Sequence, residues 1–144
     1  NVIRYRKKIS GPLLDRIDIQ INVPRETATS AQEILPVEKF RDLRNKISVA
    51  RNTQQERFKK LGIFTNAEIT YKNVDKLCLL TDDAEKLLEQ AVTTKGLSLR
   101  SYHKIKKLSR TIADLDGSEK VGQQHVAEAI SLKINDKLLS EMGN

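Results

Sequence analysis

The sequence is poor in the residues that build disulfides, membrane spans and aromatic cores. It has 144 residues, with no tryptophan, one cysteine and 4% aromatic residues, so the core must consist mainly of Leu, Ile, Val and Ala. The lone Cys78 excludes an internal disulfide, and this cysteine usage indicates a reducing compartment. Its place in the apolar run LCLL predicts a buried side chain. No apolar run approaches the roughly 20 residues of a membrane-spanning helix, and no signal peptide is visible. We therefore expect a cytoplasmic protein without a membrane partner.

Patterns typical of catalytic and metal sites are also missing. The sequence contains no G-x-x-x-x-G-K-[ST] loop, which would cradle nucleotide phosphates, and no strand with the acidic pair that would hold Mg²⁺. The two histidines, His103 and His125, lack partners at a metal-ligand spacing, so we predict no metal site and assign both to ordinary helix positions. No Ser/His/Asp arrangement is apparent. We expect the chain by itself to hydrolyse no nucleotide.

Positive charge is concentrated in the first part of the chain. The net charge is +7, and residues 1–60 carry all of it, with fourteen Lys/Arg against seven Asp/Glu. Residues 61–144 hold twelve of each kind. A basic segment beside a neutral one indicates an anionic partner such as nucleic acid or phosphate. A solvated basic surface would have the same composition.

Residues 36–61 have the periodicity of a long helix that ends at Gly62. Three- and four-residue steps predict one buried stripe, formed by Phe40, Leu43, Ile47, Ala50, Gln54, Phe58 and Leu61. A second row with the same spacing runs beside it and contains Arg41, Arg44, Ser48, Arg51, Gln55 and Lys59. The four cations of this row are candidate contacts to nucleic-acid phosphates, which such side chains bind without reading sequence. The alternative is a solvated basic face.

An alternating segment precedes this helix. In IDIQINV, residues 17–23, apolar and polar residues alternate, which predicts a half-buried strand that ends at Pro24. Residues 63–70 look extended but are short. A lone strand cannot satisfy its backbone or bury its apolar face. We therefore expect residues 17–23 to be the edge of a sheet whose other strands are missing, in a chain that begins partway through a larger α/β domain.

The remaining residues are predicted to be helical. One helix covers about residues 71–80, and Thr81 caps a second that ends at Gly96. Ser98 caps a third helix, which ends before Gly117, and the fourth covers about residues 123–140. This part of the chain could fold alone as a small bundle.

The third predicted helix places Arg100 in its first turn, where a cation is unfavourable by roughly 0.3–1 kcal/mol against the helix dipole. The helical wheel puts Arg100 away from the apolar stripe, on the side of Lys104 and Lys107. Free N–H groups at a helix N-terminus attract anions, and a guanidinium adds a planar fork of donors. Arg100 is therefore a candidate phosphate ligand, and the alternative is a solvated surface arginine.

A second arginine, Arg16, follows the short helical turn PLLD and directly precedes the alternating segment. It is flanked by Asp15 and Asp18, with which it could form a local ion pair at this junction. The other interpretation is a charged side chain that is presented at the end of a sheet and reaches towards another molecule.

Three segments resemble the magnesium-chelatase-like branch of the AAA+ ATPases. ISGPLLDRIDIQINVP, residues 9–24, resembles the segment that follows the sensor 1 strand, and residues 96–130 resemble the lid helices. Within the latter, Gly-Leu-Ser-x-Arg, Ala-Asp-Leu, Gly-Ser and His-x-x-Glu-Ala-Ile are especially similar to the ComM/YifB group. ARNTQQERF, residues 50–58, resembles the connecting segment of that group. The resemblance covers nearly the whole chain.

The resemblance implies a role for each arginine. Arg16 matches the arginine finger of the Leu-Leu-Asp-Arg motif, which reaches in trans into the ATP site of a neighbouring subunit. Arg100 matches the sensor 2 arginine, which contacts the γ-phosphate of ATP bound between core and lid. The full-length protein would be a homo-oligomer, a hexamer, that uses ATP with Mg²⁺. ComM-like members are associated with DNA branch migration in natural transformation and chelatase members with magnesium insertion into a porphyrin, and the basic face favours DNA.

The fold expected on this basis is mainly α: a helical AAA+ lid bundle, preceded by a long helix and an orphan edge strand from a truncated α/β ATPase core. We assign residues 1–35 to the core remnant, residues 36–65 to the basic connecting helix and residues 66–144 to the lid. The missing N-terminal ATPase core is the expected partner, and no cofactor is expected to bind tightly to this chain alone. Two alternatives stay open: a stand-alone basic helical module that binds nucleic acid, and a helical interaction bundle with solvated arginines.

Overall fold

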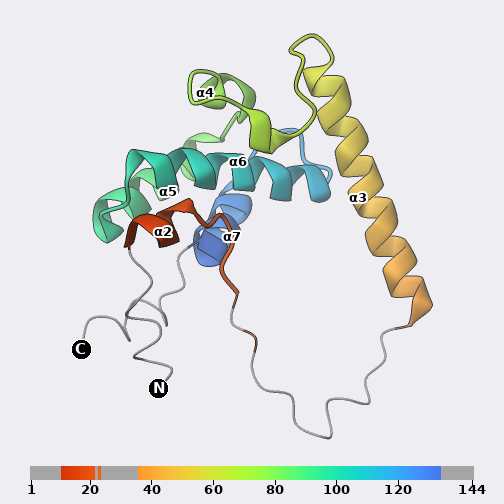
Figure 1. The fold of residues 1–144 in the computed structure, drawn as a ribbon, viewed down its shortest axis with the longest axis horizontal. Helices are drawn as coiled ribbons and strands as arrows, with labels where there is room; N and C mark the ends of the chain where they lie inside the picture. Colours follow the sequence, from red (N-terminus) through yellow and green to blue (C-terminus); the bar gives the residue numbers. More distant parts are fainter. Residues whose placement is uncertain (1–10, 22, 24–35, 134–144) are drawn as a thin grey trace, which may run out of the picture.

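The computed structural model describes residues 11–21, 23 and 36–133, which form helical segments arranged around α6 (Figure 1). In chain order they are α2 (Gly11–Arg16), α3 (Val37–Phe58), the 3-10 helix η2 (Asn66–Glu68), α4 (Val74–Leu77), α5 (Asp82–Lys95), α6 (Leu99–Leu115) and α7 (Gln123–Lys133). The mainly helical fold predicted from the sequence is confirmed. The longest described helix, α3, has 22 residues, and neither it nor any other described helix combines the length and apolarity that crossing a bilayer requires.

Local signals set the ends of α5 and α6 as predicted. The Thr81 side chain accepts a hydrogen bond from the Ala84 N–H at the start of α5. Helix α5 ends at Lys95 and is followed by Gly96, whose φ of 59° lies in the left-handed region that glycine adopts without strain. The Ser98 side chain caps α6 by accepting from the Ser101 N–H at 3.1 Å. These two helices therefore begin and end where short-range chemistry places them.

The main core lies where α5, α6 and α7 meet. Its fully buried residues are Ala84, Leu88, Ile105, Ala113, Val121, Val126 and Ala129. A second, smaller cluster of Phe58, Ile69, Val74 and Cys78 joins the C-terminal end of α3 to α4. Cys78 is 1% exposed, which confirms the prediction of a buried thiol. Both clusters are aliphatic apart from Phe58 and this thiol, as the lack of aromatic residues implied.

The strand predicted over residues 17–23 is absent: residues 17–21 and 23 have no strand assignment. The segment lies instead against the bundle, where the Gln20 N–H donates to the Leu132 carbonyl at 2.6 Å and Lys133 Nζ donates to the Ile17 carbonyl at 2.5 Å. Single hydrogen bonds to α7 thus replace the ladder that a strand would need. Ile17, Ile19, Ile21 and Val23 are exposed, so alternation here does not mark a buried sheet face.

Other boundaries also differ from the sequence predictions. Residues 63–70 contain the 3-10 helix η2 and no strand, and the helix predicted over residues 71–80 is reduced to the single turn α4. Helix α7 ends at Lys133 within the described residues, and the rest of the predicted helix over residues 123–140 lies outside them. The division into residues 1–35, 36–65 and 66–144 stays a prediction.

Helix α3 projects from the bundle, and only its C-terminal end packs against other elements (Figure 1). Of the stripe predicted to be buried, Ala50, Gln54 and Phe58 are buried. Phe40, Leu43 and Ile47 are 54%, 54% and 53% exposed, and Leu61 is 48% exposed. The stripe was predicted correctly as one face of a helix and wrongly as a continuous core, because periodicity records amphipathicity and not the presence of a partner.

Candidate functional site

The short helix α2 docks onto the N-terminus of α6 through Asp15. Its carboxylate accepts a hydrogen bond from Ser98 Oγ, 3.1 Å from each carboxylate oxygen, and a short one from Ser101 Oγ. The N-terminus of a helix favours negative charge. The sequence predicted that this end of α6 would attract a phosphate, but the chain's own carboxylate lies there. Any phosphate ligation at this end is thereby left to the Arg100 side chain.

Two lysines of the bundle hold the backbone at the end of α2. Lys133 Nζ donates to the Asp15 carbonyl at 3.0 Å and to the Ile17 carbonyl. Lys104 Nζ donates to the Arg16 carbonyl at 2.5 Å and pairs with the Asp18 carboxylate. The last carbonyls of a helix have no partner within it, and cations at this end are favourable. The C-terminus of α2 is thus capped by side chains of α6 and α7.

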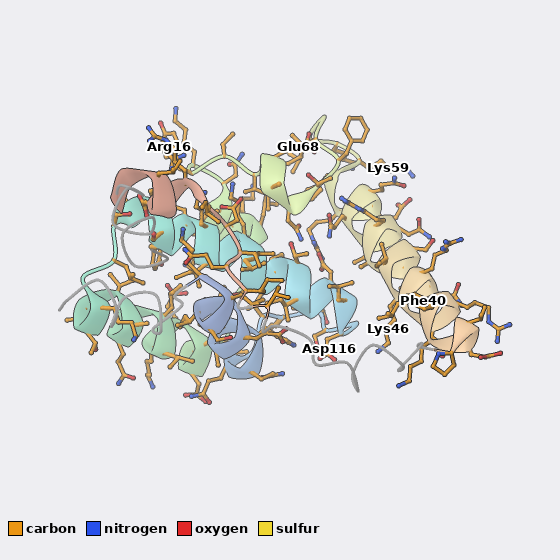
Figure 2. The ribbon with its side chains drawn as sticks, turned by 60° about the horizontal axis from the view of Figure 1, so that its bottom comes forward. Arg16, Phe40, Lys46, Lys59, Glu68 and Asp116 are labelled. Carbon is orange, nitrogen blue, oxygen red and sulfur yellow. The ribbon has the colours of Figure 1, made fainter. Side chains whose placement is uncertain are left out.

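The structure brings the two predicted nucleotide-site arginines to one end of α6. Arg16 is the last residue of α2, and Arg100 lies in the first turn of α6; both are exposed. The hydrogen bonds of Asp15 with Ser98 and Ser101, which we call the joint, connect the two segments: Asp15 is adjacent to Arg16, and the two serines lie on either side of Arg100 in the sequence. Figure 2 shows Arg16 on the outer side of α2.

The pKa of Asp15 reflects this setting. The hydrogen bond from Ser101 is the largest influence and lowers the pKa, while burial raises it. The hydrogen bond from Ser98 and the positive charges of Lys133 and Arg100 lower it further. The net result is a pKa below the ordinary 3.8. Asp15 is therefore held as a carboxylate at neutral pH, where it offsets the unfavourable placement of Arg100 at the positive end of the α6 dipole.

The predicted nucleic-acid contacts lie elsewhere. Arg41, Arg44, Arg51 and Lys59 are all exposed on α3, and Lys59 forms a loose surface pair with Glu56 at 3.6 Å. Helices α2 and α3 contact opposite ends of α6, as Figure 1 shows. The basic row on α3 and the pair formed by Arg16 of α2 and Arg100 of α6 are therefore two separate surfaces.

A buried polar network between α3 and α6 has no counterpart in the predictions. Asp114, with a fully buried side chain, binds Arg57 of α3, Arg110 of α6 and the Asn66 amide. The remaining Arg110 donors reach the carbonyls of Ser118 and Glu119 at 2.5 and 2.7 Å. The i, i+4 spacing of Arg110 and Asp114 was the available signal, but such a pair is more often on a helix surface. The network fixes α3 on the bundle.

Both histidines contact neighbouring residues of the helical bundle. Nδ1 of the buried His125 accepts from the Gly122 N–H at 2.9 Å, and its Nε2 lies 3.1 Å from the Asp116 carboxylate. The bond from the Gly122 N–H is one half of a capping box, in which the side chain at N3 accepts from the backbone of the N-cap residue. His103 lies edge-on to the Tyr102 ring on α6. Across the described ranges, no group of three or more His, Cys, Asp or Glu residues could hold a metal ion.

Comparison with known proteins identifies the family. Residues 38–133 match the family model for the C-terminal region of magnesium chelatase subunit ChlI, and residues 1–31 match the model for magnesium chelatase subunit ChlI. "Competence protein ComM" of Haemophilus influenzae is 38% identical over 144 residues, which is 99% of this chain and 28% of that protein. "Uncharacterized protein YifB" of Salmonella typhimurium is 32% identical over 138 residues, 95% of this chain and 26% of that protein.

The chain thus spans little more than a quarter of the length of these relatives. The match extends over the α2 segment, the long helix α3 and the bundle, in agreement with the three segments whose motifs resemble this branch. On this basis the chain belongs to the magnesium chelatase ChlI family, with ComM and YifB among its relatives.

Proposed function

We propose that this chain is the lid and subunit-interface portion of an ATP-driven, ComM-like motor that acts on DNA. Arg16 is its arginine finger towards a neighbouring subunit, and Arg100 is its sensor 2 residue. The observation that carries the proposal is the joint at Asp15, which attaches the helix ending in the exposed Arg16 to the end of α6 that carries the exposed Arg100. The family and the name of the relative ComM support the same assignment.

Arg16 and Arg100 could supply only some of the groups that a nucleotide site needs. Each exposed guanidinium group can bind oxygens of a transferring phosphoryl group, Arg100 at nucleotide held by its own subunit and Arg16 at nucleotide held by a neighbour, whereas Asp15 already takes the N-terminus of α6. A phosphate-binding loop and Mg²⁺ ligands would have to come from a segment of the full-length protein other than this chain. When bound there, ATP and Mg²⁺ supply the reacting phosphoryl group and neutralise its charge. An arginine finger that adds to this stabilisation is worth about 10³–10⁵ in rate.

The test measures ATP hydrolysis by the full-length protein, in which this chain is joined to that segment. We expect Arg16→Ala to lower kcat by about 10³-fold and Arg100→Ala to lower it by at least about 10-fold. Lys86→Ala, on an exposed position of α5, is the control and should retain the normal rate. Normal turnover in both arginine variants would refute the assigned roles.

Action in trans has a separate test. Arg16→Ala subunits are mixed with subunits that lack the lysine of the phosphate-binding loop, each inactive alone. If Arg16 acts on a neighbour, a mixed oligomer contains some interfaces with an intact loop and an intact finger, and activity returns in part. If Arg16 acts within its own subunit, no mixture gains activity.

A second candidate function, binding of nucleic acid by this chain, is favoured by the exposed basic row on α3. Duplex binding would depend steeply on salt, because each neutralised phosphate contributes about 0.9 to the slope of log affinity against log salt. Replacing Arg41, Arg44 and Arg51 together by Gln should lower that slope by about three. The charge-matched control replaces Lys86, Lys95 and Lys120 by Gln. Equal weakening in both, or no binding at low salt, would eliminate a specific role for α3.

A further inference from the structure

We propose that Asp15 is a positioning residue that joins the helix carrying Arg16 to the helix carrying Arg100, so that a movement of α6 displaces Arg16 with it. The inference rests on the proposed function and extends it to regulation: the lid that senses nucleotide through Arg100 also sets the place of the finger. The inference requires that α2 be attached to the bundle by several specific hydrogen bonds and not by packing alone.

The contacts at Asp15 meet that requirement. Its carboxylate is bound by two hydroxyl groups at the N-terminus of α6, those of the cap Ser98 and of Ser101. Its carbonyl accepts from Lys133 of α7 at 3.0 Å. The side chain and the backbone of one residue are thus bound by two different helices of the bundle. The loss of any one of these hydrogen bonds would leave α2 attached by the others.

The bundle also binds the chain at Arg16 and at the two residues that follow it. The Ile17 carbonyl accepts from Lys133, and the Arg16 carbonyl accepts from Lys104 of α6. Asp18 adds an ion pair with Lys104. The backbone is therefore fixed before, at and after Arg16, while the exposed Arg16 side chain extends from the joint. A rigid-body shift of α6 and α7 carries this backbone with it.

The placement of charge gives Asp15 a second effect on the same pair. Arg100 lies at the positive end of the α6 dipole, and the Asp15 carboxylate is seated at that end. Removing the carboxylate withdraws the anion that offsets both Arg100 and the dipole. Asp15 therefore influences the position of Arg16 through the backbone and the environment of Arg100 through its charge.

The test uses the full-length protein and compares Asp15→Ala with Asp15→Asn and with Asp83→Ala, an exposed acidic position in the first turn of α5. Misplacing a reacting group by about 1 Å lowers rates by up to about 10²-fold. We expect Asp15→Ala to lower kcat for ATP by at least about 10-fold with little change in KM. Asp15→Asn, which keeps an acceptor oxygen for the two serines, should recover most of the loss, and Asp83→Ala should behave normally.

A double-variant measurement shows whether Asp15 acts through Arg16. Asp15→Ala should lower kcat less in the Arg16→Ala background than in wild type, because the residue it positions is already gone and only its charge effect on Arg100 remains. Hydrogen exchange should report faster exchange for α2 amides in Asp15→Ala and in Lys133→Met, with α5 to α7 unchanged. Lys133→Met removes the hydrogen bonds to the backbone at the end of α2 and leaves the Asp15 carboxylate in place, so the result does not depend on Asp15→Ala alone.

The failure of each proposal is distinguishable. Normal turnover of Arg16→Ala overturns the proposed function, and this inference with it. Impaired turnover of Arg16→Ala together with normal turnover of Asp15→Ala overturns the inference alone. Fully additive losses of kcat in the double variant also overturn it, since Asp15 would then act independently of the finger.

Discussion

Arg57 of α3 and Asp114 of α6 form a two-point ion pair, with Nη1 2.9 Å from Oδ2 and Nη2 2.5 Å from Oδ1. The Asp114 side chain is fully buried, and that of Arg57 is 20% exposed. The same carboxylate also binds Arg110 and the Asn66 amide. One acidic residue therefore pairs with an arginine of α3 and an arginine of α6 and links the two helices.

Asp114→Ala should destabilise the chain strongly, because it leaves Arg110 buried and without its counter-charge. Removing one partner of a buried ion pair costs about 3–5 kcal/mol. Denaturant unfolding of the 144-residue chain measures the loss. The control is Glu56→Ala, which breaks the exposed pair with Lys59 and should change stability by less than about 1 kcal/mol. A similar effect of both variants would contradict the network's role.

The network also predicts a loss of stability in acid. Burial of Asp114 opposes its charged form, but Arg57, Asn66 and Arg110 outweigh burial and lower its pKa below the ordinary 3.8. A carboxyl with a depressed folded-state pKa contributes stability above its unfolded pKa, and this contribution is lost as pH falls through the folded value. The unfolding free energy should therefore decline below about pH 4.

Measuring the free energy of unfolding at several pH values in wild type and Asp114→Asn isolates this carboxyl. The variant should be less stable at neutral pH and show a shallower decline in acid, because its residue 114 takes up no proton. Parallel pH profiles of the two proteins would show that Asp114 does not contribute. Asp15, whose pKa is also lowered, adds to the decline in both proteins.

Cys78 should react slowly with thiol reagents in the folded chain. Burial raises the pKa of its thiol to about 11, and the thiolate is the reactive form. At pH 8 we expect labelling by iodoacetamide to be at least about 100-fold slower than in urea, since it requires local or global opening. Ser131→Cys in the Cys78→Ala background places a thiol at an exposed position of α7 and should label rapidly. Equal rates at both positions would show that Cys78 is accessible.

Ser98→Ala should loosen α2 as well as destabilise α6, whereas the loss of another helix cap should affect only its own helix. It removes the cap of α6 and one donor to Asp15, whereas Thr81→Ala removes only the cap of α5. Each cap is worth about 1 kcal/mol. Thermal unfolding should show a loss for both variants, and hydrogen exchange should show faster α2 exchange for Ser98→Ala alone. Unchanged α2 exchange in Ser98→Ala would mean that this hydroxyl contributes little to the joint.

The sequence by itself determined the features that depend on neighbours within a few residues. Thr81, Ser98 and Gly96 mark helix ends through bonds and backbone conformations that span no more than about one turn. The buried Cys78 and the mainly helical fold followed from apolar spacing, and the family from short motifs. For the candidate site, the sequence identified Arg16 and Arg100 as separate positions, and their roles stay a proposal.

The tertiary structure alone decided how these pieces meet. The alternation in residues 17–23 predicted a strand, but strand formation requires a hydrogen-bonding partner, and the segment bonds to α7 instead. Asp114 is buried because its charge is compensated across elements by Arg57 of α3, 57 positions away, as well as by Arg110 of its own helix. Asp15 and Ser98, 83 positions apart, join the two arginine-bearing helices. Charge compensation between distant residues leaves no periodic pattern in a sequence, so only the folded chain reveals it.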